Sequence, residues 1–156
     1  MIIHFFCDKS DDKARKLFSL TGDHVAENVE LREYISVEHF EDALHATNAQ
    51  ESLVVVAAFH EEALIDAYFI NHLLSPYDTM VILPGRDKLS IALGSVLRPR
   101  HTFFHDSSID SILAAIHDFS KKSLLKTTNK QRIENKKEAS IYNMFEDYTE
   151  RKVSNF

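Results

Sequence analysis

The stretch Leu53-Val54-Val55-Val56-Ala57-Ala58-Phe59 is an apolar run without polar interruption, and it decides the fold class. Such a run is typical of a strand in a parallel sheet that helices cover on both faces, whereas a strand with one face in water alternates. Four other segments have strand character: 2–7, 29–35, 79–83 and 101–104. The sequence therefore predicts a sheet of five strands with residues 53–59 at its centre.

Apolar residues at helical spacing fill the intervals between these strands. The helical segments are 11–20, 37–44, 61–74, 87–97 and 109–119. Ser36 is expected to cap the second of these helices, and Ser75-Pro76 to end the third. The spaced apolar residues include Ile65 and Phe69 in the third helix and Leu89 in the fourth. Alternating strands and helices imply βα crossovers, so we expect a doubly wound α/β domain over residues 1–122.

The chain changes in composition beyond residue 122. Residues 1–120 hold 9 Lys+Arg and 19 Asp+Glu, a net charge of −10, whereas residues 121–156 hold 9 and 5, a net charge of +4. Segment 126–130 has the composition of a linker, and residues 131–152 can form a helix. We expect residues 123–156 to add a basic linker and a C-terminal helical tail to the α/β domain.

The expected tail helix carries an apolar stripe of Ile141, Met144, Phe145 and Tyr148, spaced three and four residues apart. An exposed stripe with aromatic side chains is unfavourable in water, so it should cover another surface. That surface belongs either to the same chain or to a second copy. We predict that these four residues help to hold a homodimer.

The order of elements over residues 1–122 resembles the receiver domain of two-component response regulators. Gly94-Ser95 and segment 107–113 also look like the corresponding regions of that family. A flavodoxin-like binding domain has the same order of elements. The resemblance therefore implies a five-stranded fold of the receiver or flavodoxin type, and for a receiver it implies phosphorylation of an aspartate beside a divalent metal.

The positions that would carry this phosphorylation are altered. The family's acidic pair falls at Cys7-Asp8, which keeps one carboxylate, and its acceptor aspartate falls at Ala57 or Ala58. Pro84-Gly85 and His105-Asp106 stand where the family has a hydroxyl residue and a lysine. Phosphoryl transfer to a carboxylate needs an acceptor, a metal and a cation. We therefore predict a pseudo-receiver, a non-catalytic signalling or assembly module that acts through protein–protein contacts.

A second class of function stays open, because open parallel sheets bind ligands beyond the carboxyl ends of their strands. The residues expected at this rim are Asp8, His60, Glu61, Arg86, His105 and Asp106. Such groups could bind a transition metal or polarise a substrate, which would make the chain a small ligand-binding domain or an enzyme. None of the nine histidines has a zinc-site spacing, and no glycine-rich phosphate loop occurs, so we expect neither a metal nor a cofactor.

Composition disfavours several other functions. No stretch approaches the roughly 18 apolar residues of a membrane span, and the N-terminal residues do not resemble a signal peptide. The acidic first 120 residues repel nucleic acid. The single cysteine, Cys7, suits a reducing compartment and a packing role. We expect a cytoplasmic protein whose partner is a protein, without contact to membranes or nucleic acid.

Overall fold

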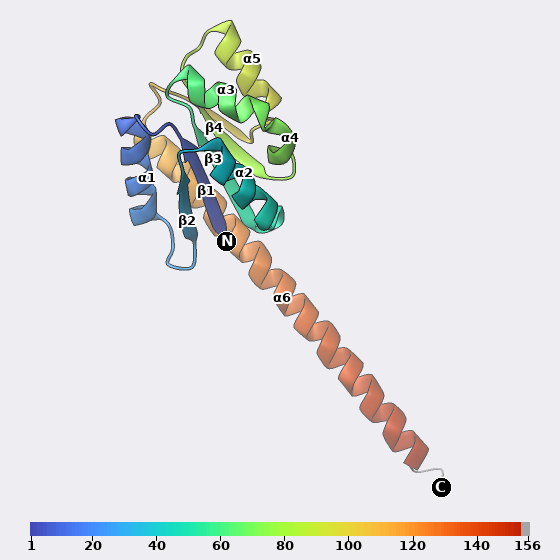
Figure 1. The fold of residues 1–156 in the computed structure, drawn as a ribbon. Coiled ribbons are helices and arrows are strands. Elements are labelled where there is room, and N and C mark those ends of the chain that lie inside the picture. The colour runs from blue at the N-terminus through green and yellow to red at the C-terminus, as the bar shows by residue number, and fades with distance from the viewer. Residues whose placement is uncertain (154–156) are drawn as a thin grey trace. The chain divides into compact units, whose positions relative to one another are not determined.

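The computed structural model describes the backbone of residues 1–153 and the side chains of residues 1–126, 128, 129 and 131–139. The chain divides into two units, Met1–Ser120 and Lys121–Phe156. The first unit contains five strands: β1 (Ile2–Cys7), β2 (Glu30–Tyr34), β3 (Ser52–Ala57), β4 (Asp78–Leu83) and β5 (His101–Phe104). All pairings are parallel and the order is β2-β1-β3-β4-β5, as in flavodoxin-like folds (Figure 1). The predicted doubly wound α/β fold is confirmed.

Helices cover both faces of this sheet. They are α1 (Asp12–His24), α2 (Val37–Ala46), the 3-10 turn η1 (Ala49–Glu51), α3 (Glu61–Phe69), α4 (Asn71–Leu74), α5 (Lys88–Val96) and α6 (Ile109–Val153). α2, α3, α4 and α5 lie on one face, and α1 and the first turns of α6 lie on the other (Figure 1). This distribution of the helices over the two faces follows from the right-handed crossovers between parallel strands.

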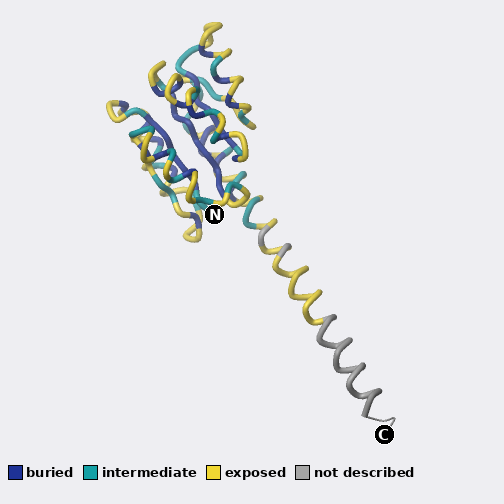
Figure 2. Tube along the Cα trace, turned by 45° about the vertical axis from the view of Figure 1, so that its right-hand side comes forward, coloured by how far each residue is buried: buried dark blue, intermediate teal, exposed yellow. Residues whose placement is uncertain are grey.

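The central strand is β3, as its sequence predicts. It lies between β1 and β4, and every one of its residues is buried, in the dark blue centre of the trace (Figure 2). Val55 pairs with Phe5 of β1 and with Met80 of β4, and its side chain is fully buried. An apolar residue at every position is therefore explained by helices on both faces.

Within the first unit, one expected helix is divided into two. Ser36 caps α2 as predicted, since its hydroxyl accepts a hydrogen bond from the amide of His39. The single helix expected over 61–74 is wrong, because the structure divides it at Ile70 into α3 and α4. The amide of the Asn71 side chain donates to the carbonyl of Tyr68, and this bond satisfies a carbonyl at the end of α3.

Two helices on the same face turn small residues toward the sheet. α3 buries Ala63 and Ala67 beside the larger Leu64, and α5 buries Ser90 and Gly94. A methyl group at Gly94 would lie 2.6 Å from a methyl carbon of Leu83 on β4, so only glycine permits this close approach. Larger apolar residues of the same helices, such as Phe69 and Leu89, lie outside this inward side and remain exposed.

The second unit is helical from Lys121 to Val153. The linker expected at 126–130 is therefore wrong, because α6 continues through it. Residues with good helix propensity on both sides carry the helix across a threonine–asparagine segment that favours helix only weakly. The side chains of Ile141, Met144, Phe145 and Tyr148 lie outside the described residues. Across the described part of the chain, no helix combines the length and the apolar character needed to cross a bilayer.

Candidate functional site at the carboxyl ends of the strands

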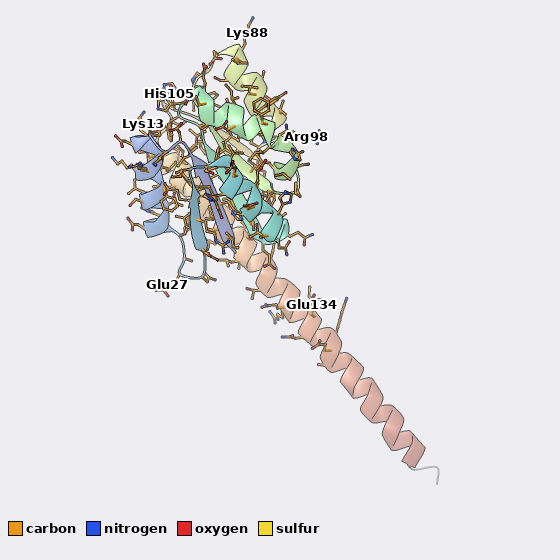
Figure 3. The ribbon with its side chains drawn as sticks, in the orientation of Figure 1. Lys13, Glu27, Lys88, Arg98, His105 and Glu134 are labelled. Atoms are coloured by element: carbon orange, nitrogen blue, oxygen red, sulfur yellow. The ribbon has the colours of Figure 1, made fainter. Side chains whose placement is uncertain are left out.

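The predicted rim lies in the loops at one edge of the sheet, because the carboxyl ends of parallel strands meet there. Asp8 follows β1, His60 and Glu61 follow β3, Arg86 follows β4, and His105 and Asp106 follow β5. Lys13 of α1 links this helix to the loop after β5, since its ammonium group donates to the carbonyl of His105 over 3.4 Å. Figure 3 shows Lys13 and His105 close together at this end of the first unit.

On the β4–β5 side, the predicted residues neutralise one another. The guanidinium of Arg86 lies 3.1 Å from a carboxylate oxygen of Asp106. The same guanidinium lies over the ring of Phe104, 3.9 Å from its centroid. Both charged side chains are more than half exposed, so this ion pair stabilises the fold only slightly. The ion pair nevertheless engages the guanidinium of Arg86 and the carboxylate of Asp106, and a ligand at this side of the rim would have to bind these same groups.

On the β1–β3 side, the main partner of His60 is a residue that the sequence does not indicate. Asp11 is buried, and one oxygen of its carboxylate caps α1 by accepting from the amides of Lys13 and Ala14. Its other oxygen lies 3.6 Å from Nε2 of His60 and has no hydrogen-bond partner among the described residues. The rim therefore includes Asp11, which the capping pattern alone explains as a helix start.

The remaining carboxylates of this side have separate partners. Asp8 accepts hydrogen bonds from the hydroxyl and the amide of Ser10, and these bonds lower the pKa of its carboxyl group. Burial, with the charges of Asp8 and Glu62 nearby, raises the pKa of Asp66 on α3. Glu61 lies exposed in the first turn of α3, where its charge favours the helix dipole. The predicted rim residues are thus near one edge but do not converge on one point.

The two alanines at the end of β3, where the resemblance to receivers would put an acceptor aspartate, carry no oxygen nucleophile. Ala57 and Ala58 are fully buried, and the Ala58 amide donates to the carbonyl of Ile82. The ring of Phe59, next in the chain, lies beneath the ammonium group of Lys13 at 5.9 Å. Within the described residues, no group of three or more His, Cys, Asp or Glu side chains could hold a metal ion.

The single thiol is also unsuited to nucleophilic chemistry. Cys7 is buried, and its Sγ lies 3.7 Å from a carboxylate oxygen of Glu33. Burial, and then the negative charge of Glu33, raises the pKa of the Cys7 thiol to about 12. Because the thiolate is the reactive form, this side chain stays a packing group at neutral pH.

The core contains a buried polar cluster around His4 that the sequence does not predict. His4 on β1 is fully buried; its Nδ1 lies 3.1 Å from the hydroxyl of Tyr34 and its Nε2 lies 3.2 Å from the hydroxyl of Thr47. The Thr47 hydroxyl donates to the carbonyl of Ala43, so it accepts from Nε2 of His4. Tyr77 also contacts Thr47. Burial, and then the charge of Arg32, lowers the pKa of His4 to about 4, so the ring is neutral.

Exposed apolar residues lie on α3 and α5, and none of them is one of the predicted rim residues. We give the name α3/α5 face to exposed apolar residues of these two helices: Ile65 and Phe69 on α3, and Leu89 and Val96 on α5. Ile91 is also exposed, but at about 100° per residue it falls on the other side of α5 from Leu89. Phe69 is 70% exposed and Leu89 is 55% exposed. The sequence shows these residues as part of helical spacing, but it does not show which side of each helix faces the sheet.

The first unit also has a shallow groove of about 530 Å³ between the end of α1 and the start of α6. Its lining residues are Asp23, His24, Asp110, Leu113, Ala114, His117 and Asp118. The ring of His24 is hydrogen-bonded to the backbone, since its Nδ1 lies 2.7 Å from the carbonyl oxygen of Leu20. The groove has no counterpart among the predicted site residues.

The fold defines the class as a flavodoxin-like α/β domain followed by a helical unit. A comparison with protein-family models finds no match, and neither does a comparison with curated protein sequences.

Proposed function

We propose that this chain is a non-catalytic assembly module of the pseudo-receiver kind, which pairs with a second copy of itself through the α3/α5 face. The observation that carries this proposal is the exposure of large apolar side chains on two adjacent helices, led by Phe69 and Leu89. Burying one side chain of this size contributes roughly 1.5–3 kcal/mol. Exposed apolar patches of this kind mark sites of protein contact.

The arrangement of the face follows from its helical positions. Ile65 and Phe69 are one turn apart on α3, and Leu89 and Val96 are two turns apart on α5. α3 and α5 lie side by side on the same face of the sheet (Figure 1), so both pairs belong to one layer of helices. A flat surface made of two helices is suited to contact with another pair of helices.

A second copy is the partner that the charges of this surface favour. Asp66 and Glu62 flank the apolar residues on α3, and Lys88 flanks them on α5; Glu62, Asp66 and Lys88 are all exposed. A twofold interface places the same patch on both sides, so it must complement itself. A patch with an apolar centre and charges of both signs at its edge meets that requirement.

The rim supports a role without catalysis. Arg86 and Asp106 pair with each other, and Ala57 and Ala58 replace an acceptor. The thiol of Cys7 stays protonated at neutral pH. These features leave assembly as the function that the described residues support best, and signalling through such an assembly is part of the proposal.

The experiment compares two charge insertions in the full chain by sedimentation equilibrium. The wild type should show a dimer of twice the 17.9 kDa chain mass. Phe69→Glu should reduce it to the monomer, because a carboxylate in the interface would lose its hydration. Ile35→Glu is the matched control, since Ile35 is also exposed but lies outside the face. A dimer that survives Phe69→Glu, or a wild type that is monomeric, would contradict the proposed function.

One observation favours the alternative of a ligand-binding rim. One buried oxygen of Asp11 has no hydrogen-bond partner in the described part of the chain, and it could coordinate a metal ion beside His60. Calorimetric titration of the full chain with Mg²⁺ or Zn²⁺ tests this alternative, with Asp11→Asn as the variant. Stoichiometric binding that Asp11→Asn abolishes would support a site; the leading proposal expects no binding heat.

A further inference from the structure

The part of α6 that follows the first unit carries its positive charge on one side. The described cationic residues are Lys121, Lys122, Lys126, Arg132, Lys136 and Lys137, and all are exposed (Figure 2). At about 100° per residue, their positions fall within an arc of about 160° around the helix. Glu134 and Glu138 fall in the opposite half. We call the cationic half the basic side of segment 121–137.

These cations are free to bind an outside partner. Among the described side chains, the five ion pairs involve residues of the first unit alone, so none uses a cation of the basic side. The segment spans about 24 Å at a rise of 1.5 Å per residue. An extended row of unpaired cations binds an extended acidic surface better than it binds a small anion.

The polar residues of the opposite half of segment 121–137 limit the classes of partner that the segment can bind. This half contains Gln131, Glu134, Asn135 and Glu138, all exposed, together with the partly buried Leu124. The exposed apolar residues Leu125 and Ile133 are separated from one another among the cations of the basic side. A helix that lies on a membrane has an apolar half to insert, and this segment lacks one. Nucleic acid is disfavoured as well, because residues 1–120 carry a net charge of −10 and repel a polyanion.

We propose that the basic side of segment 121–137 docks on the acidic unit 1–120 of a second copy of this chain. The charges of −10 and +4 on the two units make each copy complementary to the other. This inference rests on the self-association proposed above, but not on the α3/α5 face as its site. Within a pair, each basic segment meets the acidic unit of its partner at a high effective concentration.

The first test compares two full-chain variants of equal net charge. Lys122→Glu/Lys136→Glu reverses two cations of the basic side, and Lys9→Glu/Lys16→Glu reverses two exposed cations of the first unit. The first variant should weaken the dimer at least about tenfold at low salt and should remove its salt dependence, because exposed charges are screened. The second should change the dissociation constant by less than about threefold. Equal effects of the two variants, or none in either, would overturn the docking.

The second test distinguishes contact between copies from contact within one copy. An equal mixture of ¹⁴N and ¹⁵N wild-type protein is treated with a carbodiimide, which condenses a lysine amine and a carboxylate into an amide with loss of water. Cross-links between lysines of 121–137 and carboxylates of 1–120 should include pairs of mixed isotope. Pairs of one isotope only would overturn the proposal.

The outcomes separate this inference from the proposed function. A dimer without mixed-isotope cross-links keeps the assembly proposal and overturns the docking. Mixed cross-links that persist in Phe69→Glu keep the docking and reject the α3/α5 face. Binding of a 20-base-pair DNA duplex that Lys122→Glu/Lys136→Glu abolishes would assign the segment to nucleic acid and overturn the docking.

Discussion

Acidification should destabilise this protein through His4, which is buried as a neutral ring. Its pKa is about 4 in the folded chain, against 6.5 when it is exposed. The unfolded chain therefore takes up a proton near pH 6.5, whereas the folded chain does so only near pH 4. The stability that the neutral ring provides is present above the unfolded pKa and is lost as the pH falls from there through the folded pKa.

The magnitude follows from the two pKa values. Between about pH 7.5 and about pH 5.0, the free energy of unfolding should fall by about 2 kcal/mol through His4 alone, and by about 3 kcal/mol in total below pH 4. The physical cause is that Tyr34 and Thr47 satisfy both nitrogens of the neutral ring, while burial keeps water from the charged one. A loss of this size is a large part of the stability of a small domain.

Urea unfolding of three full-length proteins at the two pH values measures this effect. The wild type and His39→Gln should lose the same free energy of unfolding, because His39 is exposed. His4→Gln should start lower at neutral pH, since it disturbs the buried cluster, but should lose about 2 kcal/mol less on acidification. If wild type and His4→Gln show the same pH dependence, the reasoning about the buried ring is refuted.

Three further predictions follow from the same structure. Val55→Asp should abolish cooperative folding by circular dichroism, because a carboxylate in the central strand costs several kcal/mol; a soluble, cooperatively folding variant would be inconsistent with a fully buried β3. Gly94→Ala should lower the free energy of unfolding by about 1–2 kcal/mol through overlap with Leu83, whereas Gly22→Ala, whose added carbon would meet only ordinary contacts, should raise it by up to about 1 kcal/mol; equal changes would contradict the close approach of α5. Incubation with acetyl phosphate and Mg²⁺ should leave the intact mass unchanged, since Ala57 offers no acceptor, and a stoichiometric adduct labile to base would contradict the pseudo-receiver proposal.

The sequence predicts the sheet well because β3 is buried on both faces, and such a strand needs an apolar residue at every position from Leu53 to Ala57. Local chemistry also predicts the cap at Ser36. The linker at 126–130 was expected from composition, yet helix propagation from both sides overrides the weak propensity of three residues. Local patterns are therefore reliable where one effect dominates and fail where neighbouring segments decide.

The candidate sites are less visible in the sequence because they depend on distant residues. The cluster around His4 joins residues 30 and 43 positions away, Tyr34 and Thr47, which no local pattern connects. The strand-end rim could be placed from the fold class alone, but the pairing of Arg86 with Asp106 could not. The exposure of Phe69 depends on which side of α3 faces the sheet, and that is a property of the packed structure.

The most direct measurement of the central claim is the labelling of a new thiol on the α3/α5 face. Leu89→Cys provides this thiol, and Cys7 should stay silent because it is buried with a pKa of about 12. Maleimide labelling of Leu89→Cys should slow at least about tenfold between dilute protein and a concentration at which sedimentation shows the dimer. Labelling of Ile35→Cys should keep its rate. Equal rates for Leu89→Cys in the monomer and in the dimer would show that a second copy does not cover this face.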